Sequence, residues 1–313
     1  MRVTICFTCI TVLALLIPLL AFSSEYSGYA SEFLRVEVGA APSAMGGAYT
    51  SLAEGSIATY WNPAGITSTE HISATFSHHE CLMDLKQEFA GFTFKTPIGV
   101  FGTSFNTFTY GTLIGYDEQG NKTPDFTARS NCFSVCYARR FIEPVDMGLS
   151  FKYIWERIET AKANTIAFDI GVRAKMFNSF LIGMVIQNLG PGEKFISSSN
   201  SLPLTLRLGS AFTPYESDLF TETASVDFSM VKSGRRCLHL GSQTTLYRTI
   251  HLRAGYRHAS VDTAEEFTMG AGLSFNRLIP AFSDTNIELD FSQTFGSVEG
   301  LGNLSRITMS FEF

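Results

Sequence analysis

The sequence predicts an all-β fold, a transmembrane antiparallel β-barrel of about 14 strands that carries an N-terminal hatch, or plug, segment. Composition is the first observation: 45% of the 313 residues are hydrophobic, only 17% are charged, and Phe (28) outnumbers Lys plus Arg (23). So much apolar surface needs a large core or a bilayer. The second is a hydrophobic period of two from about residue 70 onward. The third is a typical segment length of about ten residues, which suits a tilted membrane-crossing strand better than a soluble sheet.

The first 24 residues are predicted to be a secretory signal peptide. Arg2 precedes an apolar run from Val3 to Ala21, and the small residues Ala21 and Ser23 are spaced like a cleavage site. A transmembrane anchor is the alternative, but Pro18 interrupts the run. The expected organisation is therefore signal peptide 1–24, hatch 25–69 and outer-membrane β-barrel 70–313.

Residues 25–69 do not alternate. They are rich in Gly, Ala and Ser, so they can pack tightly in a confined space, and they are too apolar for a flexible linker. We expect them inside the barrel, entered from the periplasmic side, where an even number of strands places both termini.

The strands are expected where apolar and polar residues alternate, as in the stretch NTIAFDIGVRAK from residue 164. The expected strands lie near residues 71–79, 88–96, 99–109, 129–141, 146–157, 165–176, 180–188, 203–213, 223–230, 237–247, 250–259, 267–276, 285–294 and 304–313.

The alternation also predicts which face meets lipid. An arginine that faces hydrocarbon at mid-bilayer costs about 2 to 4 kcal/mol, so the apolar set must face out and the charged set must line the lumen. Sheet edges find no water in lipid, so the strands must close. A soluble β-sandwich, propeller or solenoid is the alternative, but its strands are shorter and no repeat of fixed period is visible. The predicted lumen-lining residues are Asp169, Arg173, Arg207, Asp227, Arg253, Arg257, Glu288 and Asp290.

The connections predict two unlike rims. KTPIG, FIEPV and MFNSF are tight, whereas YGTLIGYDEQGNKTPDFTA and LGPGEKFISSSNS are long and polar, as expected of short periplasmic turns and long external loops. Two longer connections, TPYESDLFTE and NRLIPAFSD, are exceptions to this pattern, because they fall on the rim that is expected to carry short turns.

Neither metal, cofactor nor catalytic chemistry is expected. His78 and His79 lie beside Glu80 and Cys81, but neighbours on a strand point to opposite faces. Cys132 and Cys136 share a face but are about 13 Å apart, too far for a disulfide. No nucleophile-elbow, phosphate-loop or zinc-helix motif is present, and lumenal carboxylates are read as salt-bridge partners rather than an acid–base pair. The formal charge of −6 argues against a nucleic-acid partner.

The stretch VGAAPSAMGGAYTSLAEGSIATYWNPAGI resembles the N-terminal signature of the FadL-type long-chain fatty-acid transporters and their PorV/PorQ relatives. Pro42-Ser43 departs from that signature, which affects the hatch detail more than the fold. The resemblance implies a fourteen-stranded outer-membrane barrel with a hatch, and a gating role for Asn62, Pro63 and Ala64. Pro63 fixes its own backbone and disfavours helix at Asn62, so the triplet can hold a defined turn. Tyr60 and Trp61 are expected either to line a hydrophobic pocket or to wedge the hatch against the wall, with a packed turn into the first strand as the plain alternative.

What the resemblance implies is passive uptake of hydrophobic molecules such as long-chain fatty acids across a bacterial outer membrane. The alternative is a PorV-like scaffold for protein secretion or surface attachment. The expected partners are outer-membrane lipid, the hydrophobic ligand and the barrel-assembly machinery, because the final strand with Phe311 and Phe313 resembles the signal that this machinery reads.

Overall fold

A computed structural model describes residues 30–80, 84–117, 119–177, 179–195, 198–232, 234–260, 265–275, 285–296 and 304–313. The predicted signal peptide lies outside these residues. None of the helices in the described ranges has the length and apolar character of a membrane span.

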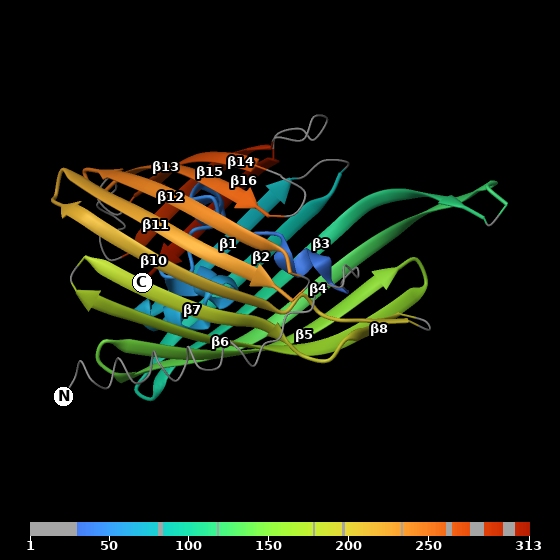
Figure 1. Cartoon of the computed structure of the whole chain (residues 1–313), viewed down its shortest axis with the longest axis horizontal. Coiled ribbons are helices and arrows are strands. Elements are labelled where there is room, and N and C mark those ends of the chain that lie inside the picture. Colours follow the sequence, from blue (N-terminus) through green and yellow to red (C-terminus); the bar gives the residue numbers. More distant parts are fainter. Residues whose placement is uncertain are drawn as a thin grey trace.

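Fourteen antiparallel strands form one closed barrel, in which each strand pairs with its sequence neighbours and β1 pairs with β16 (Figure 1). This confirms the predicted fold class. The barrel strands are β1 (Ile72–Glu80), β2 (Lys86–Thr96), β3 (Gly99–Tyr116), β4 (Lys122–Ile142), β5 (Val145–Ile158), β6 (Ala161–Phe177), β7 (Phe180–Leu189), β10 (Thr205–Glu216), β11 (Phe220–Val231), β12 (Arg236–Leu246), β13 (Ile250–Ala259), β14 (Glu265–Ser274), β15 (Asn286–Gly296) and β16 (Leu304–Glu312).

The side chains face as the alternation predicts. On β6, Phe168 is 46% exposed on the outside and Asp169 is 0% exposed inside. Barrel closure relies on the last strand, where the Phe313 amide donates to the Ile72 carbonyl at 2.9 Å and Phe311 pairs with Ala74. Polar side chains thus fill the interior while apolar ones cover the outer surface, which is the polarity of an outer-membrane-type barrel.

The two rims differ as expected, with two corrections. The rim that carries the short turns, called the short-turn rim below, includes the turns Pro97-Ile98 and Glu143-Pro144. Residues 110–128 were expected to be a loop, but β3 continues to Tyr116 and β4 begins at Lys122, so the two strands form a long hairpin that extends beyond the other strands (Figure 1). Conversely, β10 and β11 extend into TPYESDLFTE and leave only residues 217–219 between them, so this stretch does not break the short rim. All of NRLIPAFSD, residues 276–284, lies outside the described residues, so the expectation for this stretch stays a prediction.

Alternation did not predict the small sheet that follows β7. Within the expected long loop, β8 (Glu193–Phe195) pairs with β9 (Ser198–Asn200). These strands are only three residues each, too short to show a period.

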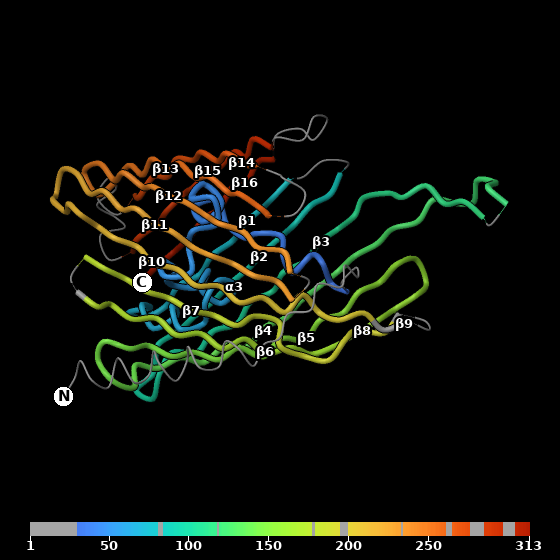
Figure 2. The backbone as a smooth tube through the Cα atoms, in the orientation of Figure 1, coloured from blue at the N-terminus to red at the C-terminus, as the bar shows by residue number. Residues whose placement is uncertain are grey.

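Residues 30–69, called the plug below, lie in the interior of the barrel (Figure 2). Their backbone is compact because Gly, Ala and Ser need little space. The short helices of the plug are η2 (Glu32–Arg35), α2 (Ala40–Ala44), η3 (Gly55–Ile57), α3 (Ala58–Trp61) and η4 (Pro63–Ser68).

Candidate functional site

The Asn62-Pro63-Ala64 triplet forms the turn between α3 and η4. Asn62 is extended, with φ −160° and ψ 107°, as expected before proline, and its Oδ1 accepts from the Ala64 amide at 3.1 Å. Its Nδ2 donates to the Thr50 carbonyl at 3.0 Å and to the Val172 carbonyl of β6 at 3.2 Å. One amide group therefore stabilises the turn, joins two parts of the plug and attaches both to the wall.

Two glycines in the wall make room for this turn. Gly148 of β5 pairs with Gly171 of β6, and both face the plug. A Cβ on Gly148 would lie 2.4 Å from the Pro63 carbonyl carbon, and one on Gly171 would lie 2.1 Å from Asn62 Oδ1. The side chain of any other residue at these two positions would enter the space that the triplet occupies. We call Gly148 and Gly171 the glycine seat of the triplet.

Inward-facing glycines continue around the barrel and form a belt. Each would place a Cβ within 3.0 Å of plug atoms, most of them backbone atoms, so the plug chain lies directly against the strands. A strand glycine is the sequence signal for such close approach, and sequence analysis overlooked it. Besides Gly148 and Gly171, the belt consists of Gly91, Gly102, Gly183, Gly209, Gly241, Gly255 and Gly270.

Tyr60 and Trp61 connect the two halves of the plug. The Tyr60 hydroxyl donates to the carbonyls of Leu34 at 3.1 Å and Val36 at 2.9 Å, and Trp61 Nε1 donates to the Val38 carbonyl at 2.9 Å. Trp61 is fully buried. These hydrogen bonds are made within the plug, so the pocket-wall, wedge and packed-turn roles of the two residues stay predictions.

Replacing Tyr60 with phenylalanine is expected to loosen η2 at a cost of about 1 kcal/mol, because both carbonyls lose a donor. Burial raises the pKa of the Tyr60 phenol above its ordinary 10.0, so the folded state keeps the proton where the unfolded state loses it. The contribution of Tyr60 to stability is thus complete below pH 10 and falls above it. Hydrogen exchange of residues 32–38 measures both effects; exchange unchanged by the substitution would contradict the assigned contact.

Four of the predicted lumen charges, Arg173, Arg207, Asp227 and Arg257, contact the plug rather than only one another. Arg173 donates to the Ser51 carbonyl at 2.9 Å and pairs with Glu54. Arg207 donates to the Gly47 carbonyl at 2.6 Å and lies 4.8 Å above the Trp61 ring. The alternation predicted that these side chains line the lumen and pair across neighbouring strands, whereas the contacts above are with the plug.

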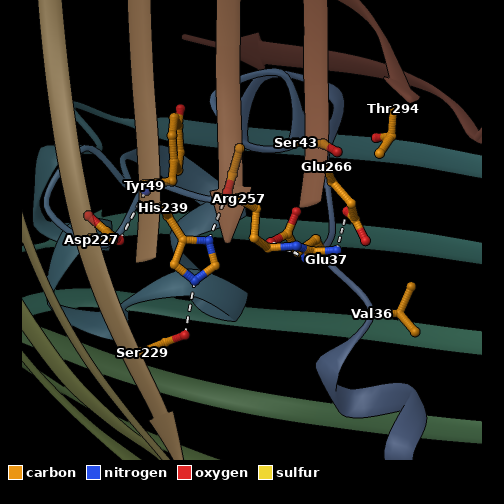
Figure 3. A network of polar contacts seen from close by, with 12 residues as sticks. Val36, Glu37, Ser43, Tyr49, Asp227, Ser229, His239, Arg257, Glu266 and Thr294 are labelled. Carbon is orange, nitrogen blue, oxygen red and sulfur yellow. Dashed lines mark hydrogen bonds and ion pairs between the residues drawn. The ribbon is translucent and has the colours of Figure 1, made fainter. Parts of the chain in front are cut away.

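Asp227 is the third of these charges. It is fully buried, and its Oδ2 accepts from the amides of Tyr49 at 3.1 Å and Thr50 at 2.8 Å (Figure 3). Arg207 lies 3.9 Å from the same oxygen. The carboxylate thus satisfies two plug amides and neutralises part of the arginine charge.

Arg257 joins the plug to β14. Its guanidinium pairs with Glu37 of the plug at 3.1 Å and with Glu266 of β14 (Figure 3). Arg253, by contrast, stays within the wall, where it pairs with Glu288 at 2.8 Å and with Asp290. Asp169 also pairs within the wall, with Lys152 at 2.7 Å.

Three further wall residues that were not among the predicted lumen residues, His239, Gln187 and Arg306, also contact the plug. His239 Nδ1 lies 2.7 Å from the Gly46 carbonyl and its Nε2 lies 2.9 Å from Ser229 Oγ (Figure 3). Gln187 donates to the Tyr60 carbonyl at 2.8 Å, and Arg306 donates to Ser43 Oγ at 2.7 Å. The alternation of apolar and polar residues could have shown that these side chains point inward. It could not have shown which atoms of the plug they contact.

Two apolar clusters lie between plug and wall. The Trp61 cluster, nearer the short-turn rim, consists of Ala53, Ile57, Ala58, Trp61, Ile66, Val100, Cys136 and Ala138. The Phe33 cluster, nearer the opposite rim, consists of Phe33, Leu34, Phe108, Cys132, Ile154, Ala167 and Leu202. Cys132 and Cys136 are buried free thiols within these clusters.

A cavity of about 300 Å³ lies between the plug and strands β1, β11, β12, β13, β15 and β16. Its lining is largely polar and includes Glu54, His251, Arg253, Glu288, Asp290 and Glu312. The cavity is suited to water and polar groups rather than to an acyl chain. Among the described residues, no group of His, Cys, Asp and Glu side chains is arranged to hold a metal ion.

Solved structures with the same architecture include two toluene transporters. The toluene transporter TodX of Pseudomonas putida has a TM-score of 0.58 at 13% identity, over 87% of this chain and 96% of that chain. The toluene transporter TbuX of Ralstonia pickettii has a TM-score of 0.58 at 12% identity, over 87% and 96%. A FadL homologue of Pseudomonas aeruginosa has a TM-score of 0.58 at 10% identity, over 89% and 98%. The chain therefore has the FadL-type barrel fold that its plug sequence resembles.

Sequence comparison adds little on function. No protein-family model matches the chain. A UPF0164 protein of Treponema pallidum (strain Nichols) is 26% identical over 200 residues, which cover 56% of this chain and 47% of that protein. The chain thus spans about half the length of this curated relative.

Proposed function

We propose that this chain is an outer-membrane channel for the passive uptake of hydrophobic small molecules, of which long-chain fatty acids are the class implied by the plug sequence. The observation that carries the proposal is a closed fourteen-stranded barrel, apolar outside and plugged inside, in the fold of known toluene transporters. The proposal includes no catalytic step and no cofactor. It includes assembly by the machinery that reads a terminal strand such as the one ending in Phe311 and Phe313.

The Phe33 cluster is the proposed ligand-responsive region. Phe33 and Leu34 of the plug are buried in one cluster with Phe108 and Ile154 of the wall and with Leu202, which precedes β10. An apolar ligand that displaces these two side chains exchanges one apolar contact for another, and burial of its own chain supplies about 0.8 kcal/mol per methylene. No energy input is needed.

Displacement at the Phe33 cluster reaches the triplet through Tyr60. The carbonyls of Leu34 and Val36 are bonded to the Tyr60 hydroxyl, and Trp61 links Tyr60 to Asn62 along the chain. Movement of η2 therefore pulls on the residue pair that precedes the turn. In this mechanism Asn62 releases the Val172 carbonyl and the turn leaves its glycine seat, while the polar cavity provides the aqueous end of the path.

Uptake of radiolabelled oleate and of toluene by cells with and without the gene tests the proposal. The gene should raise uptake of at least one of them, and Phe33→Asp should lower that gain about tenfold because it places a charge in the apolar cluster. Glu32→Gln, an exposed substitution on the same helix, is the matched control. Equal uptake with and without the gene would contradict a transport role.

A second candidate function is a surface scaffold, favoured by the long β3–β4 hairpin. β3 has 18 residues and β4 has 21, and Ile114 and Tyr116 near the tip are strongly exposed. Such an arm offers a partner protein more contact than the barrel rim alone. Co-purification of a secreted protein, without retained lipid by mass spectrometry, would support the scaffold over the channel.

A further inference from the structure

A carboxylate on the outer surface has no role in the proposed transport path. Thr223 of β11 lines the inner cavity, so its neighbour Glu222 faces outward. Its Oε1 accepts from Ser242 Oγ at 2.7 Å and its Oε2 accepts from Thr244 Oγ1 at 2.6 Å. Among the described residues, no Lys, Arg or His forms an ion pair with Glu222, and the two hydroxyls are its hydrogen-bond partners.

The side chains around Glu222 are of unequal size. Register places Tyr215 opposite Glu222 on β10 and Thr244 opposite it on β12, while the next outward row holds the small residues Ala224, Ser242 and Ala254. The large side chains nearby are strongly exposed, with Tyr215 at 56%, Phe212 at 48% and Leu252 at 49%. We call Glu222, Ala224, Ser242, Thr244 and Ala254 the outer polar patch.

The depth of the patch matches a lipid head-group region. Glu222 is two residues from the start of β11 at the short-turn rim, about 5 Å along the barrel axis for a tilted strand. The interfacial layer of a bilayer is about 5 to 8 Å thick on each side. Exposed Leu219 and Tyr247 lie still nearer the rim, as interfacial side chains do.

We propose that the outer polar patch binds a phospholipid with a primary ammonium head group. Charge complementarity selects the ammonium, because the carboxylate has no protein cation and both of its oxygens retain lone pairs toward the lipid. An ammonium offers three N–H donors, and the small side chains of Ala224 and Ala254 leave space for the glycerol and acyl chains. The site rests on the membrane placement proposed above.

A protein partner is the less suitable occupant. The patch spans five side chains on three strands, whereas a stable protein interface buries about 800 Å² on each partner. Phe212 and Leu252 project on either side and would hold a flat barrel wall away from the carboxylate. A single lipid fits between such projections.

Nanodiscs with equal amounts of phosphatidylethanolamine and phosphatidylglycerol provide the test. The full chain is inserted, extracted gently, and its retained lipids are counted by native mass spectrometry. The wild-type chain should retain phosphatidylethanolamine preferentially, and Glu222→Gln should lower that retention about fivefold, the factor supplied by one partly screened charge pair. Phosphatidylcholine, which has no N–H donors, should be retained less well than phosphatidylethanolamine.

The controls separate the patch from general effects. Glu88→Gln changes an outward carboxylate that already has His78 as partner at 2.7 Å, and it should retain lipid like the wild type. The Ser242→Ala, Thr244→Ala double variant keeps the charge but frees the carboxylate, and should weaken retention less than Glu222→Gln. A heat-modifiability gel shift shows whether each variant is folded.

Three results would overturn the site. A folded, inserted Glu222→Gln chain that retains phosphatidylethanolamine like the wild type removes the role of the carboxylate. A stoichiometric membrane protein that co-purifies with the wild type and is lost with Glu222→Gln assigns the patch to that protein instead. A chain that folds in buffer and does not enter nanodiscs overturns the proposed membrane placement together with the site, whereas the first result leaves that placement intact.

Discussion

Replacing Gly148 with valine is expected to open the barrel to small hydrophilic solutes. The new side chain would enter the seat of the triplet, where even a Cβ would lie 2.4 Å from the Pro63 carbonyl carbon and 2.5 Å from the Ala64 nitrogen. Backbone atoms cannot rotate away as a side chain can. Overpacking of this kind costs about 1 to 3 kcal/mol, enough to shift the equilibrium between a seated and an unseated plug by about fivefold or more. Liposome swelling in sugar solutions measures the opening.

Related substitutions make this test specific. Gly296→Val adds the same side chain to β15, where a Cβ would meet nothing within 4 Å, so it should leave permeability unchanged. Gly171→Val should act more weakly than Gly148→Val, because its nearest neighbour is the Asn62 side chain, at 2.1 Å, which can turn aside. Gly148→Ala is the milder variant if the valine chain fails to fold. A folded Gly148→Val barrel as tight as the wild type would show that the glycine seat does not hold the plug.

Removing the Asp227 carboxylate is expected to cost about 3 to 5 kcal/mol of stability, the range for breaking a buried, hydrogen-bonded ion pair. Asp227→Ala leaves the Tyr49 and Thr50 amides without their acceptor, and Arg207 keeps a buried charge with less compensation. Asp227→Asn keeps one carbonyl acceptor and should fall between the wild type and the alanine variant.

Urea unfolding in lipid vesicles, followed by tryptophan fluorescence, measures this loss. The chain has two tryptophans, so a Trp155→Phe background leaves Trp61, beneath Arg207, as the reporter. Asp218→Ala removes a carboxylate whose pairing with Arg248 is exposed to solvent, and should change stability little. Equal unfolding midpoints for Asp227→Ala and Asp218→Ala would contradict a structural role for the plug–wall carboxylate.

The structure restricts how the triplet could act as a gate, because its movement must break specific contacts with the plug and the wall. Asn62 is bonded to the plug and the wall at once, and the glycine belt brings the plug chain against strands around the barrel. Opening must break several such contacts together. Partial movement of η2 and the turn, as proposed above, breaks fewer of them than expulsion of the whole plug.

The number of strands, their approximate positions and the outward face of each could be predicted from sequence because these properties are local. The side-chain period on a strand is two, and the cost of charge in lipid decides which set faces out. Phe168 and Asp169 are neighbours that the pattern alone assigned to opposite faces. Local pattern was misleading at residues 110–128, where Gly, Pro and charged residues indicate a loop but β3 and β4 remain paired as far as Tyr116 and Lys122.

What only the tertiary structure decided is which atoms the inward side chains meet. Arg173, Arg207 and Asp227 were predicted to line the lumen, yet their plug partners are more than one hundred residues away in the chain. The path of the plug across the barrel determines those contacts, and no local period encodes that path. In the sequence, Gly148 and Gly171 are residues that weaken a strand. The structure shows why glycine is present there, because the Asn62-Pro63-Ala64 turn packs directly against both residues. The alternating residues determined the barrel by themselves, whereas the site depends on how an irregular segment packs within it.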